Sequence, residues 1–345
     1  MKGNLFPKII FGTSSLGNLY TEIAEEQKFE LVKNCFEESD GLVMFDSAGK
    51  YGAGLALEVL GKCLNQLNIQ KGEVQISNKL GWLRTELKGK EPTFEPGVWK
   101  NLKNDAKQTI SYKGVIECFD QGNKLLGGYT PQMVSVHDPD EYLAMAESRD
   151  HYLSLYNDIL EAYRALYDLK KEGIVSAIGI GAKDWKVIQE LSHDVNLDWV
   201  MIANSMTIKS HPQALLDLIY DFHLRDVWVI NSAVFHSGFL VGSDYFDYKL
   251  LDPHDPSTRH LYDWREKFYL ICKQYEVTPA EACVQFALQI PGVGSIALNT
   301  TDPKRVKQNI AMTEKKISPS FWSELYENGL IQIDFEKNIH VTSMD

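Results

Sequence analysis

The chain has 345 residues, of which 44% are hydrophobic, and a formal net charge of −12 with a pI near 5.3. This length and apolar content allow a large buried core. The acidic balance argues against nucleic acid or an anionic membrane as a partner. No apolar stretch is long enough for a signal peptide or a transmembrane helix, so we expect a cytoplasmic protein.

Strand-like apolar runs alternate with helical patterns in the first half of the chain. A long irregular loop over 82–110 interrupts this alternation after the third strand. Strands are predicted over 8–12, 41–48, 74–81 and 132–138, and helices over 24–39, 54–67, 112–128 and 151–173, the last ending at Gly173.

The same alternation continues in the second half, with a second long loop over 234–260 after the seventh strand. Eight strands alternating with helices predict right-handed crossovers and an α/β fold, a (β/α)8 TIM barrel that forms one domain over 1–345. Strands are predicted over 175–182, 199–204, 226–233 and 294–299, and helices over 184–192, 212–224, 262–275, 278–290, 302–312 and 318–330.

Four ionisable residues, Asp46, Tyr51, Lys79 and His137, lie in the phrases FDSAGKYG, ISNKLG and VSVHDPD. Three of them end apolar runs that read as buried parallel strands. Barrel enzymes gather catalytic groups at the carboxyl ends of several strands. The four residues therefore predict an active site.

These residue types form an acid–base unit suited to hydride chemistry. A tyrosine can exchange a proton near neutral pH if a nearby cation lowers its pKa, and Lys79 would supply that charge. Asp46 is the natural counter-ion of Lys79, and His137 can hydrogen-bond a substrate oxygen. Taken singly, each residue is better read as a turn, surface or capping residue. Their shared position at strand ends favours catalysis.

Metal and thiol chemistry have weaker support. The nine histidines show no ligand spacing such as HExxH, so no metal site is predicted. The five cysteines form no CxxC pair, as expected in a reducing compartment. Cys35, Cys63 and Cys118 fall in helical patterns, where buried, unreactive thiols are expected.

On the phrases FDSAGKYG, SNKLG and VHDPD, nearly the whole chain resembles the aldo-keto reductase family. The resemblance implies a (β/α)8 barrel and a nicotinamide dinucleotide bound without a Rossmann motif. It implies that Tyr51 is the general acid/base, that Lys79 and Asp46 tune it, and that His137 orients the substrate.

The resemblance also implies cofactor-binding residues, although the sixth strand departs from the family's usual glutamine and tyrosine. NADPH-preferring relatives often carry a lysine where this chain has Asn299. A 2′-phosphate usually recruits cations, so we expect NAD, with NADP as the alternative. The candidates are Asn204 at the end of the sixth strand, Ser232, Gly238 and Leu240 in or after the seventh, and Asn299, Thr300, Arg305 and Asn309 in or after the eighth.

Within the family, the phrase HDPDEY and the two long loops most resemble sugar 1-dehydrogenases, which act on galactose- or fucose-type aldoses. Tyr51 would then take a proton from the anomeric hydroxyl while C1 gives hydride to the cofactor, which leaves a lactone. Candidate sugar contacts are Tyr20, Trp82, Phe235 and His236.

Three hypotheses follow. The first is an NAD-dependent aldose 1-dehydrogenase, the second is an NADPH-dependent aldehyde or ketone reductase of broad specificity, and the third is a non-catalytic cofactor-sensing subunit. The complete set of Asp, Tyr, Lys and His argues against a sensor. In each case the partner is a small-molecule sugar or carbonyl compound, and the sequence leaves the oligomeric state open.

Overall fold

The computed structural model describes residues 6–247 and 249–338. Its eight main strands are β1 (Ile9–Gly12), β2 (Val43–Ala48), β3 (Val74–Leu80), β6 (Met133–His137), β7 (Ala177–Ala182), β8 (Trp199–Ala203), β9 (Trp228–Ser232) and β12 (Val293–Leu298). They form a closed barrel in the order β1-β12-β9-β8-β7-β6-β3-β2. The predicted (β/α)8 barrel and its eight strands are confirmed.

Two short antiparallel hairpins stand outside the barrel. One joins β4 (Trp82–Glu86) to β5 (Asn104–Gln108), and the other joins β10 (Tyr245–Phe246) to β11 (Lys249–Leu250). The prediction that 82–110 is irregular throughout is therefore wrong, because both ends of that segment pair as strands.

The chain divides into two compact units. The first comprises Met1–Met201 with Ala297–Ile310, and the second Ile202–Ile296 with Ala311–Asp345. The expectation of one domain over the whole chain stays a prediction.

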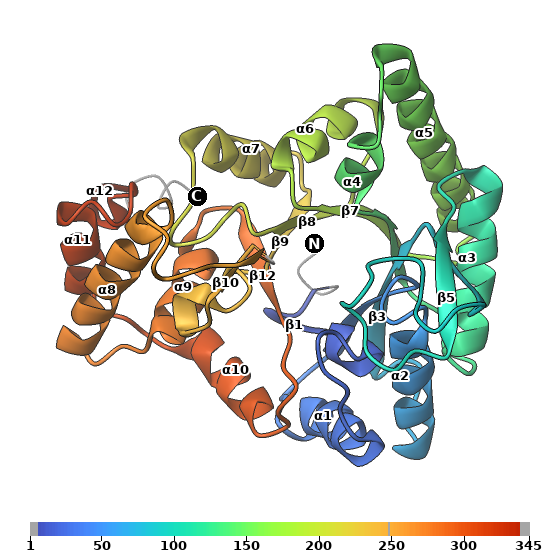
Figure 1. The fold of residues 1–345 in the computed structure, drawn as a ribbon, viewed down its shortest axis with the longest axis horizontal. Coiled ribbons are helices and arrows are strands. Elements are labelled where there is room, and N and C mark those ends of the chain that lie inside the picture. Colours follow the sequence, from blue (N-terminus) through green and yellow to red (C-terminus); the bar gives the residue numbers. More distant parts are fainter. Residues whose placement is uncertain (1–5, 248, 339–345) are drawn as a thin grey trace. The chain divides into compact units, whose positions relative to one another are not determined.

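In the first unit, helices lie on the outer side of the strands (Figure 1). α2 packs against β2, α3 against β3 and α5 against β6. The helices are α1 (Glu25–Glu37), α2 (Leu55–Gln66), α3 (Tyr112–Leu125), α4 (Pro139–Leu143), α5 (Arg149–Lys171) and α6 (Trp185–Asp194), with a 3-10 turn, η2 (Ser14–Gly17).

In the second unit, the helix over Pro279–Gln289 begins with a capping box between Thr278 and Glu281. A short helix at Phe335–Asn338, which the sequence did not predict, follows the last predicted one. The elements are α7 (Gln213–Leu224), η3 (Phe239–Val241), α8 (Arg259–Gln274), α9 (Pro279–Gln289), α11 (Pro319–Glu327) and α12 (Phe335–Asn338), while α10 (Arg305–Glu314) begins in the first unit.

The helix boundaries of the first unit follow local chemistry. The side chain of Asp184 accepts a hydrogen bond from the Lys186 amide, which confirms the predicted cap of α6. Ser148 caps α5 in the same way by accepting from the amide of His151. Gly173, just beyond the end of α5, has a φ of 73°, a left-handed conformation that favours glycine.

The register of the parallel strands brings polar residues to one end of the barrel. Asp46 on β2 pairs with Ser77 on β3, and Ala48 pairs with Lys79. All six residues of β2 are buried, as in a strand covered on both faces. Asp46 and Lys79 therefore emerge near the carboxyl ends of adjacent strands.

Gly179 on β7 is placed where a side chain would not fit. A Cβ atom there would lie 2.1 Å from the ring of Trp199, whose side chain is fully buried on β8. We expect Gly179→Ala to lower the free energy of unfolding by about 1–3 kcal/mol through overpacking. Urea denaturation measures this change. Gly41→Ala is the control, because within the described part of the chain no atom beyond its own residue and chain neighbours lies within 4 Å of the added Cβ. An equal effect in both variants would contradict the packing argument.

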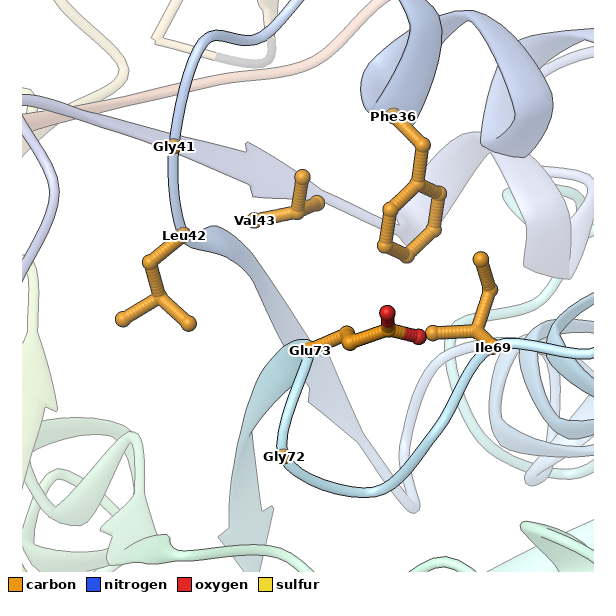
Figure 2. A pocket seen from close by; sticks show the side chains of 7 residues that line it. All are labelled: Phe36, Gly41, Leu42, Val43, Ile69, Gly72 and Glu73. Atoms are coloured by element: carbon orange, nitrogen blue, oxygen red, sulfur yellow. The ribbon is translucent and has the colours of Figure 1, made fainter.

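A pocket of about 460 Å³ lies at the amino-terminal ends of β2 and β3 (Figure 2). Val43 and Glu73 mark those strand ends, whereas Asp46 and Lys79 lie toward the opposite ends of the same strands. The pocket is thus separate from the candidate catalytic residues.

None of the helices that the structure describes combines the length and apolar character needed to cross a bilayer. The thiols of Cys35, Cys63 and Cys118 are buried in α1, α2 and α3, as predicted. Burial raises the pKa of Cys63 and of Cys118 to about 11, which keeps both protonated and unreactive at neutral pH.

Candidate active site

Asp46 and Lys79 form a buried ion pair at the carboxyl end of the strands. The ammonium of Lys79 donates to Oδ2 of Asp46, and both side chains are about 5% exposed. Burial alone would lower the pKa of Lys79, but the charge of Asp46 and the contact with Tyr51 hold it above its usual value. Lys79 therefore stays charged across the physiological range.

Tyr51 lies beside this pair, in the turn between β2 and α2. Its ring centroid is 4.8 Å from Nζ of Lys79. The turn can approach η2 closely because a Cβ at Gly17 would lie 2.8 Å from the carbonyl carbon of Tyr51. Burial raises the pKa of Tyr51 to about 12, while hydrogen bonding and charge from Lys79 act in the opposite direction.

His137 completes the group from the end of β6. Its ring meets the ring of Tyr51 edge-on, with centroids 5.6 Å apart and an interplanar angle of 84°. Burial, with the charges of Lys50 and Lys79, lowers its pKa well below the usual value, so the imidazole is neutral. Its Nδ1 has no hydrogen-bond partner among the described residues. The structure thus brings the four predicted catalytic residues together.

An aromatic cluster lies against Tyr51. Trp99, which is 5% exposed, has its ring centroid 5.9 Å from that of Tyr51. Trp82, a predicted sugar contact, packs into the same cluster with Phe94. The indole nitrogen of Trp82 is buried and has no partner within residues 6–247 and 249–338. Trp82 therefore offers a donor and an apolar plate near Tyr51.

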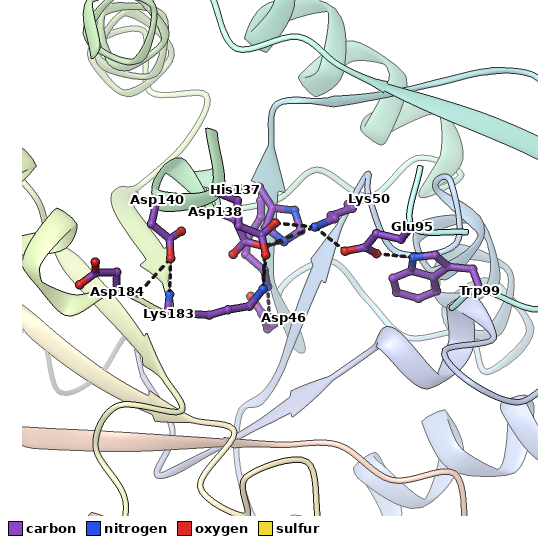
Figure 3. Close-up of polar contacts among 11 residues, drawn as sticks. Asp46, Lys50, Glu95, Trp99, His137, Asp138, Asp140, Lys183 and Asp184 are labelled. Carbon is purple, nitrogen blue, oxygen red and sulfur yellow. Dashed lines mark hydrogen bonds and ion pairs between the residues drawn. The ribbon is translucent and has the colours of Figure 1, made fainter. Parts of the chain in front are cut away.

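Lys50, directly before Tyr51, was not predicted as a site residue. Its side chain is only 5% exposed, and it pairs with Glu95 and Asp138 (Figure 3). It also pairs with Glu141. Burial acts to lower the pKa of Lys50, but the three carboxylates act to raise it and have the larger combined effect. The pKa is therefore above its usual value. The sequence signal that could have identified Lys50 as a site residue is its position inside the phrase FDSAGKYG. The sequence does not reveal which distant carboxylates surround it.

Four of the cofactor candidates lie in the first unit. Asn299, Thr300 and Asn309 line a small pocket of about 30 Å³ together with residues of β1 and α1. The Asn299 amide accepts from the Ser15 hydroxyl at 2.8 Å and donates to the Ser14 hydroxyl at 2.9 Å.

The fourth, Arg305, is exposed at the start of α10. Its Nε is 4.0 Å from Oδ2 of Asp302. The guanidinium therefore already faces a carboxylate.

The other four cofactor candidates lie in the second unit. Asn204 has a left-handed φ of 60°, and its buried Oδ1 has no hydrogen-bond partner in the described part of the chain. This unpaired amide oxygen fits a carboxamide group such as that of nicotinamide. Ser232 donates to the Ile202 carbonyl at 3.2 Å, Gly238 has a φ of 92°, and Leu240 is fully buried.

The remaining sugar-contact candidates lie in different settings. Tyr20 is 46% exposed in the first unit, and its amide donates to the Val98 carbonyl at 2.9 Å. In the second unit, Phe235 is half-buried. His236 is buried there between Thr207, at 2.7 Å, and Asp247, at 2.6 Å. The ring of His236 is thus already engaged on both nitrogens, and its role as a sugar contact stays a prediction.

Comparison with known proteins places the chain in a family. The family model described as "Aldo/keto reductase family" matches residues 8–328. A pyridoxal 4-dehydrogenase of Microbacterium luteolum is 27% identical over 93% of each chain. A D-threo-aldose 1-dehydrogenase of Pseudomonas sp. is 24% identical over 95% of this chain and 96% of its own.

A solved aldo-keto reductase from Bacillus halodurans shares the fold, with a TM-score of 0.67 and 19% identity over 94% of this chain and 92% of that chain. The family's enzymes are oxidoreductases that use nicotinamide cofactors, and the family model spans nearly all of the barrel. The chain belongs to the aldo/keto reductase family.

Proposed function

We propose that this protein oxidises C1 of an aldose to a lactone with NAD. The observation that carries the proposal is the array in which Tyr51 lies against the Lys79 ammonium, itself paired with Asp46, with the His137 ring at its edge. A phenol beside a fixed cation is suited to exchanging a proton with a substrate oxygen.

Asn299, Thr300 and Asn309 would hold part of a nicotinamide dinucleotide, and this cofactor would supply the acceptor for the hydride of C1. The protein's own residues handle the proton: Tyr51 takes it from the anomeric hydroxyl as the C1–O bond becomes a carbonyl. Lys79 stabilises the tyrosinate, and Asp46 keeps Lys79 charged and oriented. The neutral imidazole of His137 hydrogen-bonds the same substrate oxygen.

The choice of substrate class draws on the relatives and on the aromatic cluster. Aldoses, and pyridoxal with its neighbouring hydroxymethyl group, both close into cyclic hemiacetals whose oxidation gives a lactone. The names of two relatives, a pyridoxal 4-dehydrogenase and a D-threo-aldose 1-dehydrogenase, fit this shared chemistry. Trp82 and Trp99 supply the apolar plates on which a sugar ring can lie.

The preference for NAD follows from the charges near the start of α10. Asn299 contributes no cation, and Asp302 faces Arg305, so a 2′-phosphate would meet a carboxylate.

We expect Asn299→Lys combined with Asp302→Asn to raise the ratio of kcat/KM for NADP to that for NAD by about tenfold or more, because a charge-assisted hydrogen bond contributes about 1.5–3 kcal/mol. Steady-state kinetics with each cofactor measures the ratio. Gln308→Lys, which adds a cation farther along α10, is the control, and an unchanged ratio in the double variant would refute the assignment.

A second candidate function has one specific observation in its favour. With its pKa raised to about 12, Tyr51 is protonated at neutral pH, as a proton donor in carbonyl reduction must be. An NADPH-dependent aldehyde or ketone reductase would use the same four residues in the reverse direction.

The experiment that separates the two follows absorbance at 340 nm with NAD and NADP offered separately. L-fucose, D-arabinose, L-galactose and pyridoxal serve as substrates for oxidation, and a simple aldehyde with NADPH serves for reduction. Formation of NADH with one stereochemical series of aldoses supports the proposal. Consumption of NADPH with simple aldehydes, together with no oxidation of any aldose, replaces it with the reductase function.

A further inference from the structure

Lys50 is a buried cation that the proposed reaction does not use. It lies in the turn that carries Tyr51, between β2 and α2. Its ammonium contacts Oε1 of Glu95 at 2.8 Å and Oδ2 of Asp138 at 3.5 Å (Figure 3). It also contacts Oε2 of Glu141 at 3.0 Å. An ammonium has three protons to donate, so three carboxylates occupy it fully.

These carboxylates come from two segments that are distant in sequence. Glu95 belongs to the connection between β4 and β5, while Asp138 and Glu141 lie at the end of β6 and in α4. Lys50 therefore joins the β4–β5 connection and the His137 segment to the turn of Tyr51.

Backbone geometry indicates that two of the contacts are enforced. Glu95 has a φ of 42° and Asp138 a φ of 46°, in the left-handed region that side chains other than glycine rarely adopt. Strained residues of this kind persist where surrounding structure holds them and are concentrated at functional sites. Both strained residues present a carboxylate to the same ammonium.

The first branch from Lys50 leads to Tyr51. The second oxygen of Glu95, Oε2, accepts a hydrogen bond from Nε1 of Trp99 at 2.6 Å. Trp99 in turn packs against the ring of Tyr51. The ammonium also lies 5.3 Å from the ring of Trp82. Lys50 thus fixes the aromatic wall beside the reactive phenol.

The second branch leads to His137. Oδ2 of Asp138, which contacts Lys50, lies 3.5 Å from Nε2 of His137 and 4.0 Å from Nζ of Lys183. The carboxylate is therefore shared between the buried lysine and the imidazole.

We propose that Lys50 is a positioning residue that holds Tyr51 and His137 in their mutual geometry, acting on Tyr51 through Glu95 and Trp99 and on His137 through Asp138. The inference rests on the proposed function to the extent that Tyr51 and His137 are the reacting groups. The structural link through Lys50 can be tested without any turnover.

The charges around His137 set the sign of a pH effect. Lys79 from β3, Lys183 after β7 and Lys50 oppose its protonation, whereas Glu141 of α4 favours it. Asp138 is the adjoining carboxylate, and Tyr51 packs against the ring uncharged. Removing the cation of Lys50 also leaves its carboxylates uncompensated, so the pKa of His137 rises.

The test compares Lys50→Met and Lys50→Arg with Lys88→Met, an exposed lysine in the β4–β5 connection. In Lys50→Met we expect kcat to fall by about 10²-fold, the cost of a small misplacement of reacting groups, with a smaller change in KM. Lys50→Arg keeps the charge and restores part of kcat. Lys88→Met leaves both constants unchanged.

Two physical readouts accompany the kinetics. In Lys50→Met, hydrogen exchange of the amides over 97–101 should speed up, and NMR titration should show His137 protonating at a higher pH. A merely structural role would move neither the histidine titration nor the balance between kcat and KM. Wild-type values for exchange, for the titration and for kcat in Lys50→Met would overturn the inference.

A milder variant covers the case in which Lys50→Met does not fold. Lys50 and Trp99 contact different oxygens of Glu95, and Glu95→Gln replaces one of these oxygens with an NH2 group that cannot accept a hydrogen bond. We expect faster amide exchange over 97–101 and a lower kcat, and wild-type values of both would overturn the inference. If the wild-type protein oxidises no aldose, the proposed substrate class fails, whereas the exchange and titration results still decide the role of Lys50.

Discussion

Replacing Tyr51 with phenylalanine is expected to lower kcat by about 10²–10⁴-fold, the usual contribution of a general acid or base. The ring contacts with Trp99 and His137 are kept, because only the hydroxyl is lost. Cofactor affinity should therefore change little, and fluorescence titration with NADH measures it alongside the steady-state rate.

Tyr220→Phe is the matched control for this variant, since Tyr220 is 45% exposed on α7. It should behave as wild type in both measurements. A Tyr51→Phe protein that turns over at the wild-type rate would rule out Tyr51 as the proton-transfer group.

Replacing Lys79 with methionine is expected to have the second largest effect. The change leaves the buried carboxylate of Asp46 without its partner, which costs about 3–5 kcal/mol of stability. It also removes the cation that acts to lower the pKa of Tyr51, so the pKa of Tyr51 rises further. Less tyrosinate is then present at any given pH, and oxidation slows.

The pH dependence follows from the signs of these shifts. The folded pKa of Lys79 is raised, so its stabilising charge is fully present below its unfolded value of about 10.4 and is lost only as pH rises through the higher folded value. Oxidation by wild type should therefore accelerate with pH as Tyr51 deprotonates. In Lys79→Met the rise should be displaced to higher pH.

A profile of kcat/KM for oxidation between pH 7 and about 10 measures this displacement, since the unfolded lysine titrates near 10.4. Lys113→Met, at an 88% exposed position, is the control and should match wild type. Identical profiles for Lys79→Met and wild type would show that Lys79 does not tune Tyr51. Circular dichroism establishes that the variant is folded.

The barrel could be predicted from sequence because parallel strands that are buried on both faces consist of short runs of apolar residues. β2 and β3 are examples, each buried almost throughout. The same pattern located Asp46, Lys79 and His137, since a polar residue that ends such a run must lie at a strand end. Tyr51 followed from its nearness to Asp46 in the chain.

The β4–β5 hairpin could not be predicted in this way. Its strands, Trp82–Glu86 and Asn104–Gln108, are largely polar and are separated by a long connection, so neither carries a local apolar alternation. Their pairing depends on contacts such as the Arg84 amide with Gln121 of α3, which only the folded chain brings together.

The burial of Lys50 was equally hidden from sequence. A lysine next to a turn is normally solvated, and its burial depends on carboxylates from Glu95, Asp138 and Glu141. Two of these residues adopt left-handed backbone conformations that a pattern of residue types does not encode. The burial of Lys50 therefore depends on ion pairs between residues distant in sequence, and strand periodicity does not predict such pairs.

The most direct measurement of the central claim uses an aldose carrying deuterium at C1, such as [1-²H]-L-fucose, with NAD and the purified protein. If C1 gives hydride while Tyr51 takes the hydroxyl proton, mass spectrometry should find one deuterium in the reduced nicotinamide and none in the lactone. The Tyr51→Phe variant should form neither product at a comparable rate. Reduced nicotinamide without deuterium, or no reduction with any aldose, would contradict the account.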